Sequence, residues 1–138
     1  MTTLWSGRFD AAPDQAAFEW GSSFSFDRRL FEDDVRGSMA WARALEKAGV
    51  LSRQQAAAID TALQSILERG RADSAFVSGP DEDVHSFVER LLVERLGDTG
   101  KRLHTGRSRN EQVSLDLRLY LRRRIPLLQH AAAEVVGA

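Results

Sequence analysis

The side chains best suited to chemistry lie in one short stretch of the chain, from Lys101 to Gln112. Positions 101–109 hold four lysines and arginines, and within this stretch the first acidic residue is Glu111. The capping-box pattern of Ser108 and Glu111 predicts that a helix starts here, where free backbone N–H groups and the positive end of the helix dipole favour an anion. We therefore expect a receptor for a carboxylate or a phosphate.

Several donors accompany this predicted helix start. Thr105 and Ser108 offer hydroxyl groups, Asn110 offers its amide, and Arg107 or Arg109 can grip a carboxylate with a planar fork of N–H groups. Gly106 permits a close approach of the backbone to a ligand or a positive φ. A second interpretation remains open from the residues alone: Ser108 only caps the helix, and the arginines are solvated or pair with the acidic residues 81–83.

Two further polar positions stand near predicted helix starts. Asp81, Asp83 and His85 are residues of the kinds that bind metals. On a helix, however, the second of them would face away from the other two. The spacing therefore favours an acidic N-terminal cap and predicts no metal site. His85 is then a candidate for orienting an anion site. Ser23 lies where an N-terminal arm meets the first long helix, and capping is its simplest role.

Apolar residues recur at spacings of three and four along most of the chain, which predicts an all-α fold. Residues 1–22 lack such a period and are expected to form an extended arm. The expected helices run from Ser25 to about Gly49, from the capping box at Ser52 to Gly70, from the acidic residues 81–83 to Gly97, and from Ser108 past residue 138 with a kink at Pro126; residues 71–80 and 98–106 are expected to be loops.

Composition narrows the class of protein. The 138 residues carry 19 basic and 20 acidic side chains, no cysteine and 43% apolar residues, which suits one soluble domain or slightly more. The near-zero net charge creates no global field for nucleic acid or an anionic membrane, and no apolar run approaches the roughly 20 residues of a membrane span. We expect a cytoplasmic protein with no nucleic-acid partner, no membrane partner and no thiolate metal site.

The last predicted helix is apolar around much of its circumference between Leu115 and Leu121. Three shorter helices and an arm offer little cover for it. It therefore either assembles with other chains or belongs to a larger polypeptide, although the preceding elements could also fold back over it.

Several segments resemble, in the same order, the N-terminal part of the argininosuccinate lyases, a family of the fumarase/aspartase superfamily. The run His104–Val113 is the most specific of them. Ser6 stands where the family usually has glycine, and Glu111 where it usually has aspartate, which keeps the capping role. The other matching segments are Leu4–Phe9, Asp27–Arg28 with Val35–Ser38, Leu45–Gly49 and Asp81–His85.

The resemblance implies a reversible β-elimination that splits argininosuccinate into arginine and fumarate, without a metal or other cofactor. Such a site must hold a carboxylate beside a developing carbanion and protonate the leaving nitrogen. By matching positions, Ser23 and Asn110 are expected to bind substrate, Ser108 and Arg109 to belong to the same carboxylate-binding segment, and His85 to lie beside the site in a supporting role.

The resemblance also implies what this chain lacks. The family's general base is a serine on a flexible glycine/serine loop, its acid-side histidine belongs to a Thr-His pair, and both lie C-terminal to the matched region. Family members are homotetramers whose active sites combine segments of three subunits. We therefore expect residues 1–107 to form a helical domain, residues 108–138 to begin a central bundle, and the chain alone to contain no catalytic residue and to be inactive.

Two other functions remain open. Another lyase of the superfamily, such as adenylosuccinate lyase, would act on a purine succinyl substrate. A non-catalytic structural protein is the alternative from a different class, because lyases of this family have been reused as lens crystallins.

Overall fold

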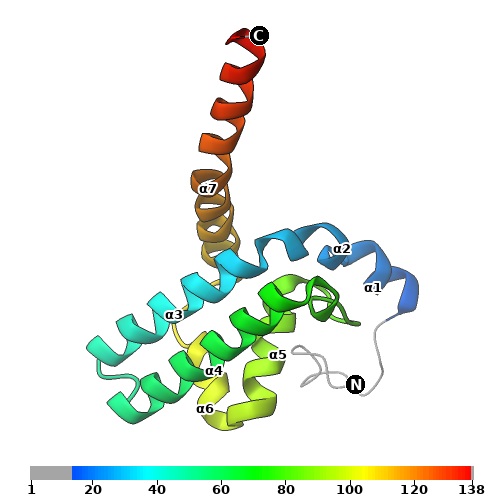
Figure 1. The fold of residues 1–138 in the computed structure, drawn as a ribbon. Coiled ribbons are helices and arrows are strands. Elements are labelled where there is room, and N and C mark those ends of the chain that lie inside the picture. Colours follow the sequence, from blue (N-terminus) through cyan, green and yellow to red (C-terminus); the bar gives the residue numbers. More distant parts are fainter. Residues whose placement is uncertain (1–13, 138) are drawn as a thin grey trace.

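The computed structural model describes residues 14–137. It consists of a body of packed helices from which the last helix projects (Figure 1). No strand occurs within that range, so the all-α prediction is confirmed. The elements are α1 (Gln15–Gly21), α2 (Phe24–Asp27), η2 (Arg28–Leu30), α3 (Phe31–Lys47), α4 (Arg53–Ala72), η3 (Ser74–Phe76), α5 (Val84–Leu96), α6 (Asp98–Lys101), η4 (Arg102–His104) and α7 (Arg109–Gly137).

The helices α3 and α4 run antiparallel and side by side (Figure 1), as the short connection between them predicted. Gly49 takes φ +75° after α3, a conformation that suits glycine. The Ser52 capping box then starts α4: the Ser52 hydroxyl accepts from Gln55 N at 3.2 Å, and Gln55 Oε1 accepts from Ser52 N at 3.0 Å. Local sequence therefore sets both the turn and the register of this pair.

The helix α5 packs against α3 and α4 and closes the core. Asp83 caps it by accepting from Ser86 N at 2.6 Å, and Gly97 ends it at φ +55°. Phe87 is buried with its ring centroid 5.3 Å from that of Phe24, which anchors α2 over the start of α5. The largest fully buried apolar side chains are Phe87, Ile59, Leu63, Ile66, Leu92, Val35, Val84 and Val88.

Two boundary predictions are wrong. Part of the expected arm is helical: Asp14 accepts from Ala17 N at 3.0 Å and so caps α1, whose residues are helix formers. The expected loop 98–106 contains α6 and η4, because buried Gly100 packs directly on the backbone of α5. The arm residues 1–13 lie outside the described range.

The third predicted helix starts at Val84, directly after the acidic residues that the sequence places at its cap. Asp83 supplies its cap, whereas Asp81 turns away and forms a two-pronged ion pair with Arg90, at 2.9 Å to Nε and 2.8 Å to Nη2. Asp83 therefore caps the helix, and Asp81 stabilises the preceding loop through its ion pair with Arg90.

The helix α7 is anchored by its first turns on α3 and η2 and then leaves the body (Figure 1). It continues through Pro126, so the proline does not end it. Among the described residues of α7, Gln112 and Asp116 are the buried ones, and Arg123 adds an ion pair with buried Asp33 at 2.8 Å. The approach of α7 to α3 depends on Gly37, where an added Cβ would stand 3.3 Å from Asp116 Oδ1.

Beyond these anchors, α7 exposes a long apolar surface. Leu128 is 68% exposed and Val136 is 88% exposed. No helix in the range 14–137 is both long enough and apolar enough to cross a membrane. The other large exposed apolar residues of α7 are Val113, Leu115, Leu117, Leu121, Ile125, Leu127 and Val135.

We predict that Gly37→Leu lowers the free energy of unfolding by about 1–3 kcal/mol, because the new side chain must displace the buried Asp116 carboxyl group. Urea unfolding followed by circular dichroism measures this change. Ala40→Leu, on an exposed position of the same helix, is the matched control and should shift stability by less than about 0.5 kcal/mol. Equal effects of the two substitutions would contradict the packing role of Gly37.

Candidate functional site

The start of α7 has the capped geometry that its sequence predicts. Gly106 takes φ +67° in the preceding turn. Ser108 N donates to Glu111 Oε2 at 3.1 Å, and Ser108 Oγ accepts from Asn110 N at 3.3 Å. Ser108 and Asn110 are both exposed, so the hydroxyl hydrogen of the first and the side-chain amide of the second remain available to a ligand.

The Arg109 guanidinium is turned toward α5 and is held there. Its Nη1 donates to Gln112 Oε1 at 2.8 Å, and its Nη2 lies 3.5 Å from Ser86 Oγ. Asp83 and Glu89 stand farther off, each with a carboxylate oxygen 3.7 Å from the guanidinium. With 22% of its side chain exposed, Arg109 is a positioned cation at the edge of the body.

Arg107 points to a different place from Arg109. It is directed inward, and its Nη1 donates to the buried hydroxyl of Ser38 at 3.0 Å. Burial lowers its pKa from the ordinary value, against the opposing attraction of Asp34. Of the two arginines that the sequence offers for gripping a carboxylate, Arg107 is therefore engaged inside the body.

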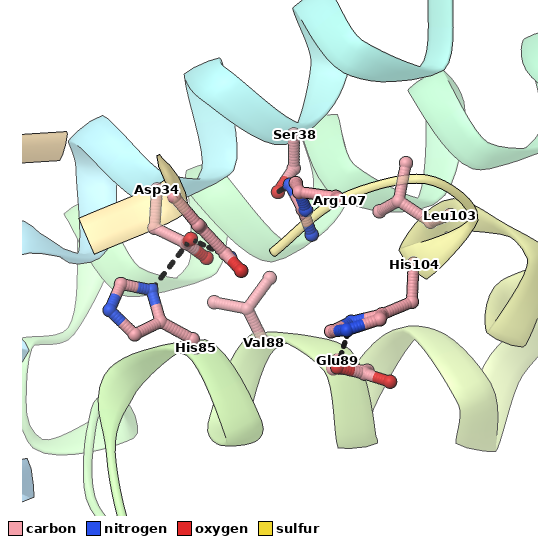
Figure 2. Close-up of a pocket in the computed structure, with 9 residues that line it drawn as sticks. Asp34, Ser38, His85, Val88, Glu89, Leu103, His104 and Arg107 are labelled. Carbon is pink, nitrogen blue, oxygen red and sulfur yellow. Dashed lines mark hydrogen bonds and ion pairs between the residues drawn. The ribbon is translucent and has the colours of Figure 1, made fainter. Parts of the chain in front are cut away.

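Arg107 borders a small cavity inside the body (Figure 2), with a volume of about 10 Å³, enough for one water molecule. Buried polar atoms without a hydrogen-bond partner face it, among them Asp34 Oδ2 and Arg107 Nε. His104 and Glu89 close another side, with 3.3 Å between His104 Nδ1 and Glu89 Oε2. The cavity is too small for a dicarboxylic substrate, so it is part of the support of the site.

Ser23 is linked to the start of α5 through Asp27. Its hydroxyl donates to Asp27 Oδ2 at 2.5 Å, and Asp27 Oδ1 accepts from Val84 N at 3.0 Å. Ser23 N also donates to Glu82 O at 2.9 Å. Ser23 and Arg109 are therefore each tied to the first turn of α5, Ser23 through Asp27 and Arg109 through Asp83.

His85 lies in the interior between three helices and forms, with Asp34 and Asp116, a cluster that we call the buried triad. His85 Nδ1 lies 2.9 Å from Asp34 Oδ1 (Figure 2) and 3.3 Å from Asp116 Oδ2. Gln112 Nε2 donates to the same Asp34 Oδ1 at 2.5 Å. The triad thus joins α3, α5 and α7 at one point without access to solvent, since none of its side chains is more than 2% exposed.

The triad distributes its charges unequally. Burial alone would lower the pKa of His85, but its hydrogen bonds to Asp116 and Asp34 raise the pKa to about 9. Burial raises the pKa of Asp116 to about 7, with the hydrogen bond from His85 opposing it. Burial also disfavours the charge on Asp34, but hydrogen bonds from His85 and Gln112 hold its pKa below the ordinary value. At neutral pH the stable arrangement is an imidazolium–carboxylate pair beside a second carboxyl group whose protonation burial favours.

The triad is the one group within residues 14–137 whose donor types and spacing would suit a metal ion, with one atom of each residue within 4.8 Å of the others. It differs from the set of Asp81, Asp83 and His85 that the sequence analysis considered. Direct contacts account for its geometry: His85 Nδ1 forms a hydrogen bond with Asp34 Oδ1 and an ion pair with Asp116 Oδ2. We assign it as a proton-linked cluster.

Sequence reasoning identified His85 but missed its partners. Asp34 and Asp116 each occupy a helix position that turns toward the interior, and a charged residue within an apolar stripe is the signal that could have drawn attention to them. Gln112 was also missed, because its burial, with 3% of the residue exposed, arises only when α7 packs against α3.

Comparison with known proteins places this sequence in a family. The sequence model of the family described as "Lyase" matches residues 7–136. A protein named "Argininosuccinate lyase" from Desulforudis audaxviator is 46% identical over 135 residues, which cover 98% of this chain and 29% of the relative.

Two further relatives carry the same name. The protein from Pelotomaculum thermopropionicum is 46% identical over 138 residues, covering 100% of this chain and 30% of the relative. The protein from Caldanaerobacter subterraneus is 47% identical over 133 residues, covering 96% of this chain and 30% of the relative. The chain therefore spans less than a third of the length of the curated relatives that it matches.

The raised pKa of His85 makes stability depend on pH. Because the folded pKa of about 9 exceeds the ordinary 6.5, the stabilisation is complete below pH 6.5 and is lost as the pH rises through 9. We predict that the free energy of unfolding falls over this window by up to roughly 3 kcal/mol. Asp116 also stabilises the fold at low pH, because its pKa is raised from the ordinary 3.8 to about 7. This stabilisation is complete below pH 3.8 and is lost as the pH rises through 7.

Denaturant unfolding at a series of pH values measures this dependence. His85→Gln should flatten the upper window, whereas His130→Gln, on an exposed turn of α7, should leave it intact. If the free energy of unfolding of His85→Gln still falls between pH 6.5 and 9 as in the wild type, His85 is not the source of this pH dependence.

Proposed function

This chain belongs to the lyase family, and we propose that it forms the N-terminal, substrate-binding part of an argininosuccinate lyase. The proposed reaction is the reversible β-elimination that converts argininosuccinate into arginine and fumarate. The observation that carries the proposal is the identity of 46–47% to proteins of that name over 96–100% of this chain. We further propose that it acts in the cytoplasm.

The arrangement around the start of α5 supports a role in substrate binding. Ser23 and Arg109 are each linked to the start of α5, through Asp27 and Asp83, and Ser108 and Asn110 lie exposed on the adjoining end of α7. Hydroxyl, amide and guanidinium donors beside a helix N-terminus suit a carboxylate.

The same donors fit the demand of the reaction. Removal of a proton next to a carboxylate builds additional negative charge, which fixed N–H and O–H donors and a nearby guanidinium stabilise without reorganising. In this proposal Ser23, Asn110, Ser108 and Arg109 bind and orient the substrate. His85 acts from the interior, because its buried position keeps it from reaching a ligand and leaves it a supporting role.

The catalytic proton transfers are assigned to residues outside this chain. By family resemblance, a serine on a flexible loop removes the proton and a Thr-His pair serves the leaving nitrogen. We propose that residues 1–107 form the helical domain, that residues 108–138 begin the central bundle, and that the complete protein is a homotetramer. The exposed apolar surface of α7 supports this assembly, since a bundle would cover it.

We predict that this chain alone releases no fumarate from argininosuccinate, because by family resemblance the general base lies C-terminal to the region that this chain matches. Mixed with a full-length lyase mutated only at the Asn110 position, it should restore activity if neighbouring subunits complete each other's sites. Absorbance of fumarate measures both. Release of fumarate by the chain alone would contradict the assignment of the proton transfers to residues outside it. Protection of the site by a purine succinyl compound in place of argininosuccinate would contradict the proposed substrate.

A second prediction concerns Arg109→Ala in a full-length lyase that carries this chain as its N-terminal part. Loss of the guanidinium should raise KM for argininosuccinate and lower kcat together, with kcat/KM reduced by about 100-fold. Arg53→Ala, at an exposed position on α4, is the matched control. Unchanged kinetics in Arg109→Ala would remove Arg109 from the proposed site.

A further inference from the structure

Gln112 lies between the buried triad and the proposed substrate-binding surface. It occupies α7 one turn after Arg109 and is 3% exposed. The two ends of its side-chain amide make different contacts: Nε2 donates to Asp34 Oδ1 at 2.5 Å, and Oε1 accepts from Arg109 Nη1 at 2.8 Å. A single side chain therefore connects a buried carboxylate to a guanidinium at the edge of the body.

The chemistry of the two neighbours fixes the orientation of this amide. A carboxylate can only accept hydrogen bonds and a guanidinium can only donate them. Rotating the Gln112 amide by half a turn would place donor against donor at Arg109 and acceptor against acceptor at Asp34. The low pKa of Asp34 keeps its carboxylate in the accepting form. The amide oxygen is thus held toward Arg109.

Gln112 also competes with two acids for Arg109. Asp83 and Glu89 lie 3.7 Å from the guanidinium, whereas the neutral Gln112 oxygen lies at 2.8 Å. A direct, charge-assisted bond to either acid would be stronger and would cancel much of the positive charge. The amide fills a hydrogen-bonding position on the guanidinium, so that both acids stay at the longer ion-pair distance of 3.7 Å and neither forms a direct hydrogen bond to it.

We propose that Gln112 is a positioning residue that holds Arg109 for the substrate carboxylate and that takes its own orientation from Asp34. This inference rests on the proposed function, because it assigns Arg109 to carboxylate binding. Without Gln112, the guanidinium moves onto Glu89 or Asp83 and the site loses affinity for its ligand.

A double-mutant cycle in the full-length lyase tests the proposal. Gln112→Met keeps the length and helix preference of the side chain but removes both hydrogen bonds. We expect it to raise KM for argininosuccinate by about tenfold when Arg109 is present and by less than about twofold in the Arg109→Ala background. Gln112→Glu is the second variant, with the same expectation, because its carboxylate would neutralise Arg109.

Stability provides the readout that separates positioning from a purely structural role. Loss of the bond to Asp34 should lower the unfolding midpoint of Gln112→Met equally in both backgrounds, while the effect on KM appears in only one. Gln54→Met, at an exposed position near the start of α4, is the matched control for the substitution itself. The control should change neither KM nor the midpoint.

The outcomes distinguish this inference from the proposed function. If Arg109→Ala leaves KM unchanged, the assignment of Arg109 to substrate binding fails. If Arg109→Ala raises KM but both Gln112 variants have no effect, or the same effect in both backgrounds, only the role of Gln112 is overturned.

Discussion

The hydrogen bond of His85 to Asp34 and its ion pair with Asp116 join α3, α5 and α7 at one buried point, and the position of the proposed site follows from them. Burying these groups is costly unless each finds a partner. Apolar side chains of similar volume could pack in many rotations, whereas a triad of directional bonds accepts one arrangement of the three helices. The triad thereby fixes which face of α7 meets the body and where its first turn lies.

This constraint explains how neighbouring residues of one basic stretch come to serve different purposes. Arg107 precedes the helix and is directed into the body, where it helps to balance the charge of Asp34. Arg109, two positions later, is directed toward the first turns of α5, where Gln112 holds it. Arg107 therefore stabilises the interior around Asp34, and Arg109 remains beside the exposed donors of Ser108 and Asn110.

Features that depend on local sequence could be predicted well. The capping boxes at Ser52 and Ser108, the terminating glycines and the apolar periodicity indicated the long helices, and the cap of α1 at Asp14 was missed because no apolar period follows it. The triad could not be predicted, because Asp34 and Asp116 are far apart in the chain and meet only after three helices have packed. For the same reason the sequence identified the basic stretch but not which arginine faces the interior.

The protonation state of His85 tests the central role of the triad most directly. Nuclear magnetic resonance of the imidazole nitrogens reports its tautomer and its titration midpoint in the folded protein. The account predicts that both ring nitrogens stay protonated through neutral pH, with a pKa of about 9. A midpoint near the ordinary value of 6.5, with a neutral ring above it, would contradict the claim that an imidazolium joins the three helices.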